Sequence, residues 1–313
     1  MKDNLVAFFE DNFVNLNDAK VSIMCHAFMY GTAIFEGIRG YYNSSHDTVY
    51  LFRLNEHIQR LLENIKILRL EIKYTQNDIY QLIVDLVNKN NPKEDIYIRP
   101  SVYNSAKKIG PGLGTINPSD LSIFMIPFGD YFNANSGLKV QVSSWRRVED
   151  NAIPARGKIV GAYANTALAK GDAQASGFDD CIVLTESGHV SEGSAMNIFL
   201  VKHGKLITSS ITDNILEGIT RDTVIKLAKS ELNIETMDRT IDRSELYLAD
   251  EIFFCGTGAQ ITPVLNVDNR KIGNEQVGSI TAKIQEQYLK TCRGELNKFK
   301  DWLTPVKSTS QVH

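Results

Sequence analysis

Lys158 is the residue whose type and setting are best suited to covalent chemistry. It lies in IPARGKIVGAYAN, a stretch rich in small residues, with Gly157 and Gly161 nearby and no amphipathic helical pattern. A lysine that is poorly solvated in such a stretch can act as a nucleophile. The alternative, an ordinary solvated lysine, is the commoner outcome for any single lysine.

Glu192 is a candidate buried acid. It lies in HVSEGSAMNIFLV, between a turn and an apolar strand. Buried acids are nearly always paired. A cationic ring nitrogen is one candidate partner for this carboxylate, and a nearby arginine is the simpler alternative.

The segment YIRP reads as a strand that presents Tyr97 and Arg99 on one side and Ile98 on the other. An arginine beside a tyrosine, next to a long loop, can clamp a carboxylate through two hydrogen bonds. The alternative for Arg99 is a surface salt bridge.

Two turns contain glycines at places suited to an anion. Gly218, Ile219 and Thr220 begin a predicted helix, where backbone N–H groups and the helix dipole favour a phosphate. Gly256 and Thr257 follow a predicted strand, where glycines can form a second cradle of N–H groups. A plain N-cap at Thr220 and a simple turn are the alternatives. Neither a dinucleotide fingerprint nor a P-loop is present.

The elements that must position these residues are mixed strands and helices. Apolar residues recur at helical spacing or in short apolar runs, separated by polar loops. The 107–120 segment, KKIGPGLGTINPSD, is a long loop of the kind that is often functional. Helices are expected over 54–68, 78–87, 220–232, 244–249 and 274–292, and strands over 97–102, 121–126, 138–144, 181–184, 196–201, 206–208 and 252–255.

The order of these elements predicts an α+β fold of two domains. Strands and helices do not alternate as regular βαβ units, which argues against a doubly wound sheet. A loop-like stretch over 127–136 separates a small α/β domain over 1–126 from a larger domain over 137–313. The tail after Trp302 is expected to be poorly ordered.

Composition excludes several classes of protein. The 313 residues carry 34 Lys+Arg and 37 Asp+Glu, a net charge of −3, which argues against a nucleic-acid partner. No apolar run suggests a membrane span, and the N-terminal stretch does not resemble a secretory signal. The four cysteines are far apart without a CxxC pair, so we predict buried thiols, no metal site and a cytoplasmic location.

The motifs resemble those of the fold-type IV aminotransferases that use pyridoxal 5'-phosphate (PLP). The family signature is matched by EGSAMNIF at 192–199, by Thr208, and by LEGITR at 216–221. Within this family the chain resembles the branched-chain amino acid aminotransferases, from about Phe13 to Tyr288. The matching stretches are HAFMYGTAIFEGIRGY at 26–41, LNEHIQRL, YIRP, SSW, SELYLADE and GTGAQITPV.

The resemblance implies a role for each cofactor-site residue. Lys158 would form the Schiff base with the cofactor and move the substrate proton. Glu192 would pair with the pyridine nitrogen, making the ring an electron sink, and Tyr163 would lie near the phenolic oxygen. Arg60, Ile219, Thr220 and Thr257 would hold the phosphate, and Leu216, Gly218 and Gly256 complete the cofactor-binding set. For Arg60 the helical pattern alone predicts a solvated side chain, and we follow the resemblance.

The resemblance also implies a substrate site. Tyr97 and the Thr257–Gly258 backbone would hold the α-carboxylate, and Arg99 would hold the distal carboxylate of glutamate or 2-oxoglutarate. Tyr30 from a neighbouring subunit would assist. An apolar pocket would be lined by Phe35, Phe128 and Tyr131. Many relatives carry asparagine where this chain has Ala162, and several carry tryptophan in place of Phe128.

The predicted activity is transfer of the amino group of L-leucine, L-isoleucine or L-valine to 2-oxoglutarate. Small amino acids and 2-oxo acids would be its partners, without nucleic acid or membrane, in a homodimer or an assembly of dimers. The alternatives are a D-amino acid or (R)-amine transaminase, an aminodeoxychorismate lyase, and a non-catalytic protein of the same fold. Retention of both Lys158 and Glu192 argues against the last.

Overall fold

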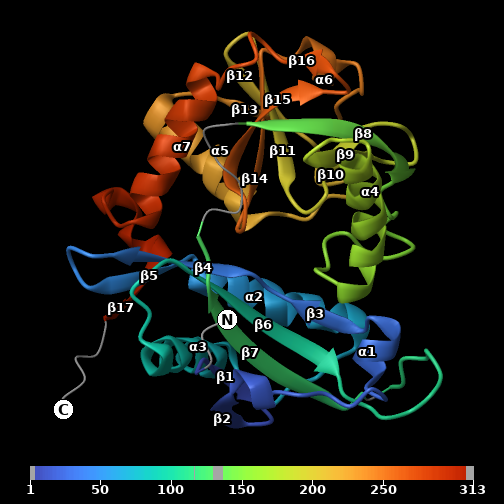
Figure 1. Cartoon of the computed structure of the whole chain (residues 1–313), viewed down its shortest axis with the longest axis vertical. Helices are drawn as coiled ribbons and strands as arrows, with labels where there is room; N and C mark the ends of the chain where they lie inside the picture. The colour runs from blue at the N-terminus through green and yellow to red at the C-terminus, as the bar shows by residue number, and fades with distance from the viewer. Residues whose placement is uncertain (1–3, 116, 130–136, 308–313) are drawn as a thin grey trace. The chain divides into compact units, whose positions relative to one another are not determined.

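The computed structural model describes residues 4–115, 117–129 and 137–307, shown in Figure 1. The chain divides into two compact units. Unit 1 comprises Met1–Gly129, Gly157–Gly161 and Thr291–His313, and unit 2 comprises Asp130–Arg156 and Ala162–Lys290. Each unit combines one sheet with helices, as expected of an α+β fold.

Unit 1 is built on a sheet that has eight strands within the described residues, in the order β17-β5-β4-β6-β7-β1-β2, with β3 paired to β6. All of these pairs are antiparallel. The strands are β1 (Val6–Phe9), β2 (Asn12–Asn15), β3 (Ala33–Phe35), β4 (Ile38–Asn43), β5 (Thr48–Phe52), β6 (Ile96–Asn104), β7 (Ser119–Pro127) and β17 (Leu303–Lys307).

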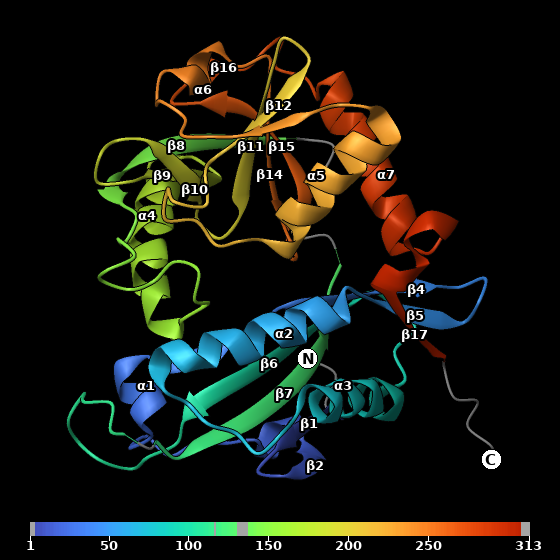
Figure 2. The ribbon, with the colours of Figure 1, turned by 180° about the vertical axis from the view of Figure 1, so that it is seen from behind.

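Two helices of unit 1 cover one face of this sheet. The helices are α1 (His26–Tyr30), α2 (Leu54–Asn64) and α3 (Gln76–Asn90), with short 3-10 helices at Leu16–Asp18, Ile65–Leu68 and Asn297–Trp302. Figure 2 shows α2 and α3 in front of β6 and β7. Their fully buried residues include Ile58, Leu61, Ile79 and Ile83, the same residues that recur at helical spacing in the sequence.

The C-terminal segment corrects two expectations. Leu303–Lys307 forms β17, which pairs antiparallel with β5, so the prediction of a poorly ordered tail after Trp302 is wrong for these residues. Val306 is buried opposite Val49, and this burial together with the backbone hydrogen bonds holds the strand. The described residues from Thr291 to Lys307 therefore belong to unit 1, not to a domain that begins at residue 137.

The segment around Lys158 also belongs to unit 1. Ile159 forms a bridge with Ile34, the Phe35 N–H donates to the Lys158 carbonyl (3.2 Å), and the Gly161 N–H donates to the Gly31 carbonyl (3.0 Å). These contacts are non-local, so the prediction that Lys158 belongs to the second domain is wrong.

Unit 2 is built on a mixed sheet that has nine strands within the described residues, in the order β10-β9-β8-β15-β14-β11-β12-β13, with β16 paired to β15. β8 runs parallel to both β9 and β15, and β12 runs parallel to β13. The strands are β8 (Leu138–Arg146), β9 (Asp180–Leu184), β10 (Val190–Gly193), β11 (Asn197–Lys202), β12 (Lys205–Thr208), β13 (Thr236–Asp238), β14 (Glu251–Gly256), β15 (Gln260–Val267) and β16 (Arg270–Lys271).

The helices of unit 2 include one that begins later than its pattern suggested and one that the sequence did not reveal. They are α4 (Tyr163–Ala175), α5 (Ile219–Leu232), α6 (Glu245–Leu248) and α7 (Ser279–Cys292). A 3-10 turn at Val160–Ala162, most of which belongs to unit 1, precedes α4. The predicted start of α7 at residue 274 is wrong because the Glu251 carboxylate accepts the N–H groups of Ile280 and Thr281 and so caps the helix there. In Figures 1 and 2, α5 and α7 lie side by side. None of the helices in the described ranges is long and apolar enough to span a bilayer.

Candidate functional site

Arg99 and Lys158 both lie against the ring of Phe35 in unit 1. The Arg99 Cζ atom is 4.3 Å from the Phe35 ring centroid, and the Lys158 Nζ atom is 4.9 Å from it. Arg99 Nε and Nη2 both donate to the hydroxyl oxygen of Tyr97 (3.1 and 2.8 Å). The prediction that Tyr97 and Arg99 share one side of their strand is confirmed, and buried Ile98 points to the other side.

The aromatic contacts continue to Phe128. The Tyr97 and Phe128 rings are 5.3 Å apart, and the buried Arg39 guanidinium lies 5.1 Å above the Phe128 ring. Arg39 Nη2 also donates to the carbonyls of Phe128 (3.1 Å) and Gly129 (2.7 Å). Phe35, Tyr97, Arg99 and Phe128 therefore form one wall of rings interrupted by a cation, which we call the aromatic wall. Tyr131 lies outside the described residues.

Gly37 leaves room for the Tyr97 side chain because it has no Cβ atom. A Cβ atom at residue 37 would lie 2.3 Å from the Tyr97 hydroxyl oxygen and 2.9 Å from two ring carbons. Because no side chain can be accommodated there without moving the ring, glycine at this position is a packing requirement of the aromatic wall. Gly37 stands in the quoted stretch FEGIRG, but the sequence alone did not assign it a role.

Arg60 is held by a buried carboxylate. Its Nε donates to Glu36 Oε1 (2.7 Å), its Nη2 donates to Glu36 Oε2 (2.9 Å), and only 14% of its side chain is exposed. His57, one turn earlier on α2, shares Glu36 Oε2 with Arg60 through its Nδ1 (2.8 Å). The helical pattern alone predicted a solvated Arg60, and that is wrong because Glu36, between β3 and β4, reaches α2.

The buried Glu36–His57–Arg60 cluster has shifted titration behaviour. Burial would raise the pKa of Glu36, but the Arg60 charge and the His57 hydrogen bond outweigh it and hold this pKa well below its ordinary value. Burial lowers the pKa of His57, and the charges of Arg60 and Lys158 lower it further, against the effect of Glu36. The cluster is therefore an ionised Glu36–Arg60 pair beside a neutral imidazole.

These shifts predict that the protein loses stability as the pH falls below about 6.5. The unfolded His57 imidazole takes up a proton below its ordinary pKa of 6.5, whereas the folded one resists protonation. This group alone should reduce the free energy of unfolding by up to about 1.4 kcal/mol per pH unit, and Glu36 acts in the same direction only below its ordinary pKa of 4.5. Urea unfolding between pH 7.5 and 5 measures the slope.

His57→Asn should flatten that slope, because the amide can donate to Glu36 but does not titrate. His203→Asn is the matched control, since His203 is exposed and has a φ of 50° that asparagine tolerates. Parallel pH profiles for the wild type and His57→Asn would contradict the prediction.

Tyr30 is tied to a neighbouring loop of its own chain. Its hydroxyl oxygen accepts the Gly110 N–H (3.0 Å), and its ring contacts the buried His26 ring at a centroid distance of 4.7 Å. His26 in turn bonds the Thr32 hydroxyl and the Gly110 carbonyl. Tyr30 therefore anchors the start of the predicted long loop.

Glu192 in unit 2 is buried, and its carboxylate contacts Arg147, Asn197 and the Leu216 backbone. Arg147 Nη2 lies 3.0 Å from Glu192 Oε1, and both the Asn197 Nδ2 and the Leu216 N–H donate to Oε2 (3.2 Å each). The simpler sequence alternative, an arginine partner, is thus present. The ion pair with Arg147 and the hydrogen bonds from Asn197 and Leu216 help fix the orientation of the Glu192 carboxylate.

Asn197 connects the two parts of the sequence signature, because it bonds both Glu192 and Leu216. Besides Glu192, its Nδ2 donates to the Leu216 carbonyl (2.9 Å), which ties the start of β11 to the segment before α5. A Cβ atom at Gly218 would lie 2.0 Å from the Asn197 Oδ1, so only glycine allows this approach. Asn197 links the glutamate to the LEGITR stretch, and the sequence signature contains its position without indicating that role.

The N-terminus of α5 has no side-chain cap. Gly218 is the N-cap, so the alternative of Thr220 as a plain N-cap is wrong. Ile219 and Thr220 are buried in the first turn. Arg221, the basic end of the signature, donates to the Ser209 carbonyl (3.1 Å) and pairs with Asp238, so it holds neighbouring segments of the fold together.

The second glycine turn joins β14 to β15. Gly256 ends β14, and Thr257 and Gly258 form the turn that follows. Because Asn197 pairs with Cys255 in the sheet, this turn begins beside the Glu192 partners, and Gly256 approaches Ala195 and Met196. Tyr163 is the first residue of α4 in the same unit.

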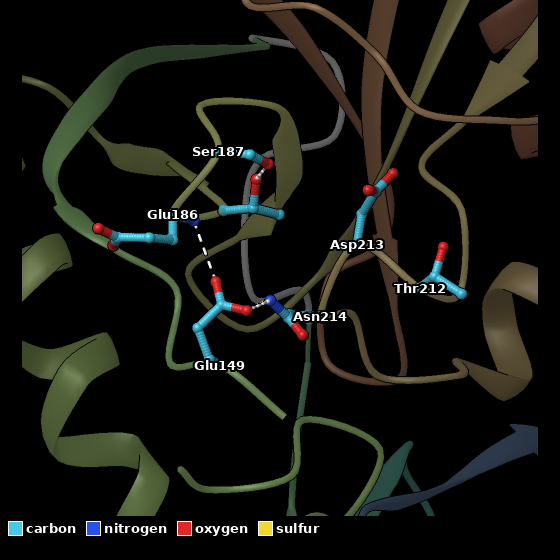
Figure 3. A pocket seen from close by; sticks show the side chains of 7 residues that line it. Glu149, Glu186, Ser187, Thr212, Asp213 and Asn214 are labelled. Carbon is cyan, nitrogen blue, oxygen red and sulfur yellow. Dashed lines mark hydrogen bonds between the residues drawn. The ribbon is translucent and has the colours of Figure 1, made fainter. Parts of the chain in front are cut away.

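A cavity of about 370 Å³ lies beside Asn214 and Glu149 in unit 2. Figure 3 shows Glu149, Glu186, Ser187, Asp213 and Asn214 around it, with Thr185 and Thr212 completing the lining. Glu149 accepts from the Glu186 N–H (3.0 Å) and the Asn214 amide (2.8 Å). The Asn214 carbonyl accepts from Arg147 Nε (3.1 Å), so this cavity wall supports the residue that pairs with Glu192.

The structure therefore groups the predicted residues within each unit and adds others. Unit 1 brings Phe35, Tyr97, Arg99, Phe128 and Lys158 together, with Arg60 on the adjacent Glu36, while Tyr30 lies with His26. Unit 2 brings Glu192, Leu216, Gly218 and the Gly256 turn together. Sequence reasoning missed Glu36, Gly37, His57, Arg147 and Asn197. The signal available for Glu36 was an acidic residue among the apolar and small residues of FEGIRG.

Comparison with known proteins gives consistent results. A family model described as "Amino-transferase class IV" matches residues 33–267. A probable branched-chain-amino-acid aminotransferase of Aquifex aeolicus is 47% identical over 300 residues, which cover 96% of each chain. The branched-chain aminotransferase of Thermoproteus uzoniensis, crystallised with norvaline, has a TM-score of 0.91 and 41% identity, covering 96% of this chain and 99% of that one. The branched-chain amino acid aminotransferase of Thermobaculum terrenum in its PLP form has a TM-score of 0.93 and 35% identity, covering 98% of this chain and 99% of that one.

Proposed function

Because this chain belongs to the class IV aminotransferase family, as its signature predicted, we propose that it transfers the amino group of L-leucine, L-isoleucine and L-valine to 2-oxoglutarate with PLP as cofactor. The products are the branched-chain 2-oxo acids and L-glutamate. The observation that carries the proposal is the aromatic wall, an apolar surface with Arg99 set into it. The names of the full-length relatives support the same substrates.

The aromatic wall suits two different substrates at one place. Phe35 and Phe128 offer apolar area to an aliphatic side chain. Arg99 offers two-point binding to the distal carboxylate of glutamate or 2-oxoglutarate. When no carboxylate is present, the Tyr97 hydroxyl and the Phe35 ring remain as partners for the guanidinium. When an apolar substrate displaces water from Arg99, these partners still stabilise the charge of its guanidinium.

Gly37→Ala is expected to raise the KM for L-leucine by about tenfold or more and to lower the free energy of unfolding by about 1–3 kcal/mol, the usual cost of overpacking. The added methyl group displaces the Tyr97 ring, and a shift of about 1 Å in a substrate-positioning group can cost up to about 100-fold in rate. Steady-state kinetics and thermal unfolding measure the two effects. Gly112→Ala is the matched control, because a Cβ atom there meets nothing within 4 Å. An unchanged KM in Gly37→Ala would show that Tyr97 does not position the substrate.

The residues of unit 2 fit a phosphorylated pyridine. A buried carboxylate, Glu192, suits a protonated ring nitrogen, and the N-terminus of α5, which begins at Gly218 without a side-chain cap, suits a phosphate. We assign Glu192, Tyr163, Leu216, Gly218, Ile219, Thr220, Gly256 and Thr257, with Arg60 and Lys158 of unit 1, to the PLP site. When bound, PLP supplies an electron sink for the bond broken at the substrate α-carbon.

The chain's own residues carry out the proton transfers and the orientation. The Lys158 amine would hold the cofactor through its aldehyde and, once displaced by the substrate amine, would serve as the general base for the α-carbon proton. Glu192 holds the ring nitrogen protonated, while Arg147, Asn197 and the Leu216 N–H keep its carboxylate in place. Tyr97 and the Thr257–Gly258 backbone orient the α-carboxylate.

We also propose that the chain works as a homodimer or a larger assembly of dimers. Large apolar side chains are exposed near Tyr30: Val21, Ile23, Met24, Phe28 and Ile109. Gly110, next to the most exposed of these, bonds both Tyr30 and His26, so they lie in one region of unit 1. Exposed apolar clusters commonly mark protein interfaces, and this one supports delivery of Tyr30 to a partner's site. The free cysteines, all buried, support a cytoplasmic location.

A two-substrate assay tests the activity. Purified protein is incubated with 2-oxoglutarate and either L-leucine or D-alanine, and glutamate is measured. Glutamate should form with L-leucine and not with D-alanine. Activity confined to D-alanine would favour a D-amino acid transaminase, and no transfer from L-leucine would overturn the proposal.

A further inference from the structure

Glu36 is a buried charge without a role in the reaction described above. Its side chain is fully buried, yet it accepts three hydrogen bonds, two from Arg60 and one from His57. A buried carboxylate is costly unless it is paired. Arg60 and His57 are three residues apart and therefore project from the same face of α2. The joint between β3 and β4 is thus clamped to one face of this helix.

The contact fixes more than the position of Arg60. Nε and Nη2 form one edge of the planar guanidinium, and each donates to a different Glu36 oxygen. Two parallel hydrogen bonds define the plane of the group, whereas one bond would allow it to rotate. A free arginine side chain has many rotamers, and ordering it on binding an anion costs affinity. In this chain the Arg60 side chain is already ordered by its contacts with Glu36 in the folded protein.

We propose that Glu36 is a positioning residue for the cofactor phosphate: it holds the Arg60 guanidinium in the orientation in which the phosphate meets it. The inference rests on the proposed function, because it requires that Arg60 belongs to the PLP site. Glu36 acts only through Arg60 and does not touch the cofactor. His57 completes the carboxylate's hydrogen bonds and orients it in turn.

Two effects of Glu36 on the phosphate oppose each other. Its negative charge repels an anion, so removing it would tighten phosphate binding if charge alone mattered. Its two-point contact pre-orients Arg60, so removing it loosens phosphate binding if orientation matters more. Arg60 keeps its positive charge in both cases, and the Glu36 charge is already compensated within its ion pair with Arg60. We therefore expect orientation to dominate.

The experiment compares PLP with pyridoxal, which lacks the phosphate, in titrations of the apoprotein followed by absorbance. The measured quantity is the ratio of the two dissociation constants. Glu36→Leu and Glu36→Gln should each lower the preference for PLP by about tenfold or more, which is about 1.4 kcal/mol. Pyridoxal affinity should stay nearly unchanged. Arg60→Gln should lower the preference similarly, and adding Glu36→Leu to Arg60→Gln should cause no further loss.

Glu56→Gln is the matched control, because Glu56 lies on the same helix but pairs with Arg53. Circular dichroism shows whether each variant is folded, and Glu36→Gln retains the shape of the side chain should Glu36→Leu fail to fold. An unchanged or increased preference for PLP in folded Glu36 variants would overturn the inference, as would a further loss in the double variant. A wild type that binds no PLP would overturn the proposed function itself.

Discussion

Lys158→Ala is expected to bind PLP and to lose amino transfer by about 1,000-fold or more. Alanine has no amine to bind the cofactor aldehyde or to take the proton from the substrate α-carbon, and this group serves in both half reactions. The loss therefore falls on kcat. The phosphate and ring-nitrogen contacts assigned to unit 2 do not involve Lys158, so the cofactor remains bound without a covalent link.

Three measurements check this expectation: kcat for L-leucine with 2-oxoglutarate, PLP content by absorbance, and the mass of the protein after borohydride reduction. Reduction should fix the cofactor on residue 158 of the wild type and fix nothing on the variant. Lys226→Ala is a suitable control, because Lys226 is exposed and pairs with Asp222 on α5. Full activity in Lys158→Ala would refute the assignment of the catalytic lysine.

Glu192→Gln is expected to lower kcat by about 100-fold or more, the scale seen when one placed electrostatic group is removed from an active site. A neutral amide cannot stabilise a positive charge on the ring nitrogen as a carboxylate does. The shape of the side chain is kept, so the Asn197 and Leu216 contacts are largely preserved. The fold and the phosphate contacts should therefore survive.

The loss in Glu192→Gln has a second contribution. Arg147 is about nine-tenths buried and loses its charged partner, which leaves a positive charge near the ring nitrogen. The absorbance spectrum of the bound cofactor should change with the protonation of the ring, in addition to the fall in kcat. Glu186→Gln is the control, since Glu186 is an exposed residue at the cavity of Figure 3. Wild-type kcat in Glu192→Gln would contradict the role assigned to this carboxylate.

Local patterns in the sequence were sufficient to predict those helices and strands that bury only one face. The apolar stripe of α2 and α3 matches their buried residues, and the alternation of YIRP placed Tyr97 beside Arg99. The α4 helix was missed because its stretch of small residues has no clear apolar stripe, and its buried positions are mostly alanines. Strand β17 was missed because its stability comes from pairing with β5, about 250 residues earlier.

The sequence by itself determined the family and the reactive residue types, because its signature depends on residues at fixed positions along the chain. It did not determine which side chains hold those residues in place. Arg60 looked solvated by helical period, yet its partner Glu36 lies 24 residues away on a strand joint. Arg147 reaches Glu192 from the segment that follows β8, and the Lys158 segment is held in unit 1 by Gly31 and Ile34. Such contacts depend on how distant segments of the chain pack against each other. The spacing of residues along the chain does not indicate which buried charge pairs with which partner. Only the tertiary structure decided these pairings.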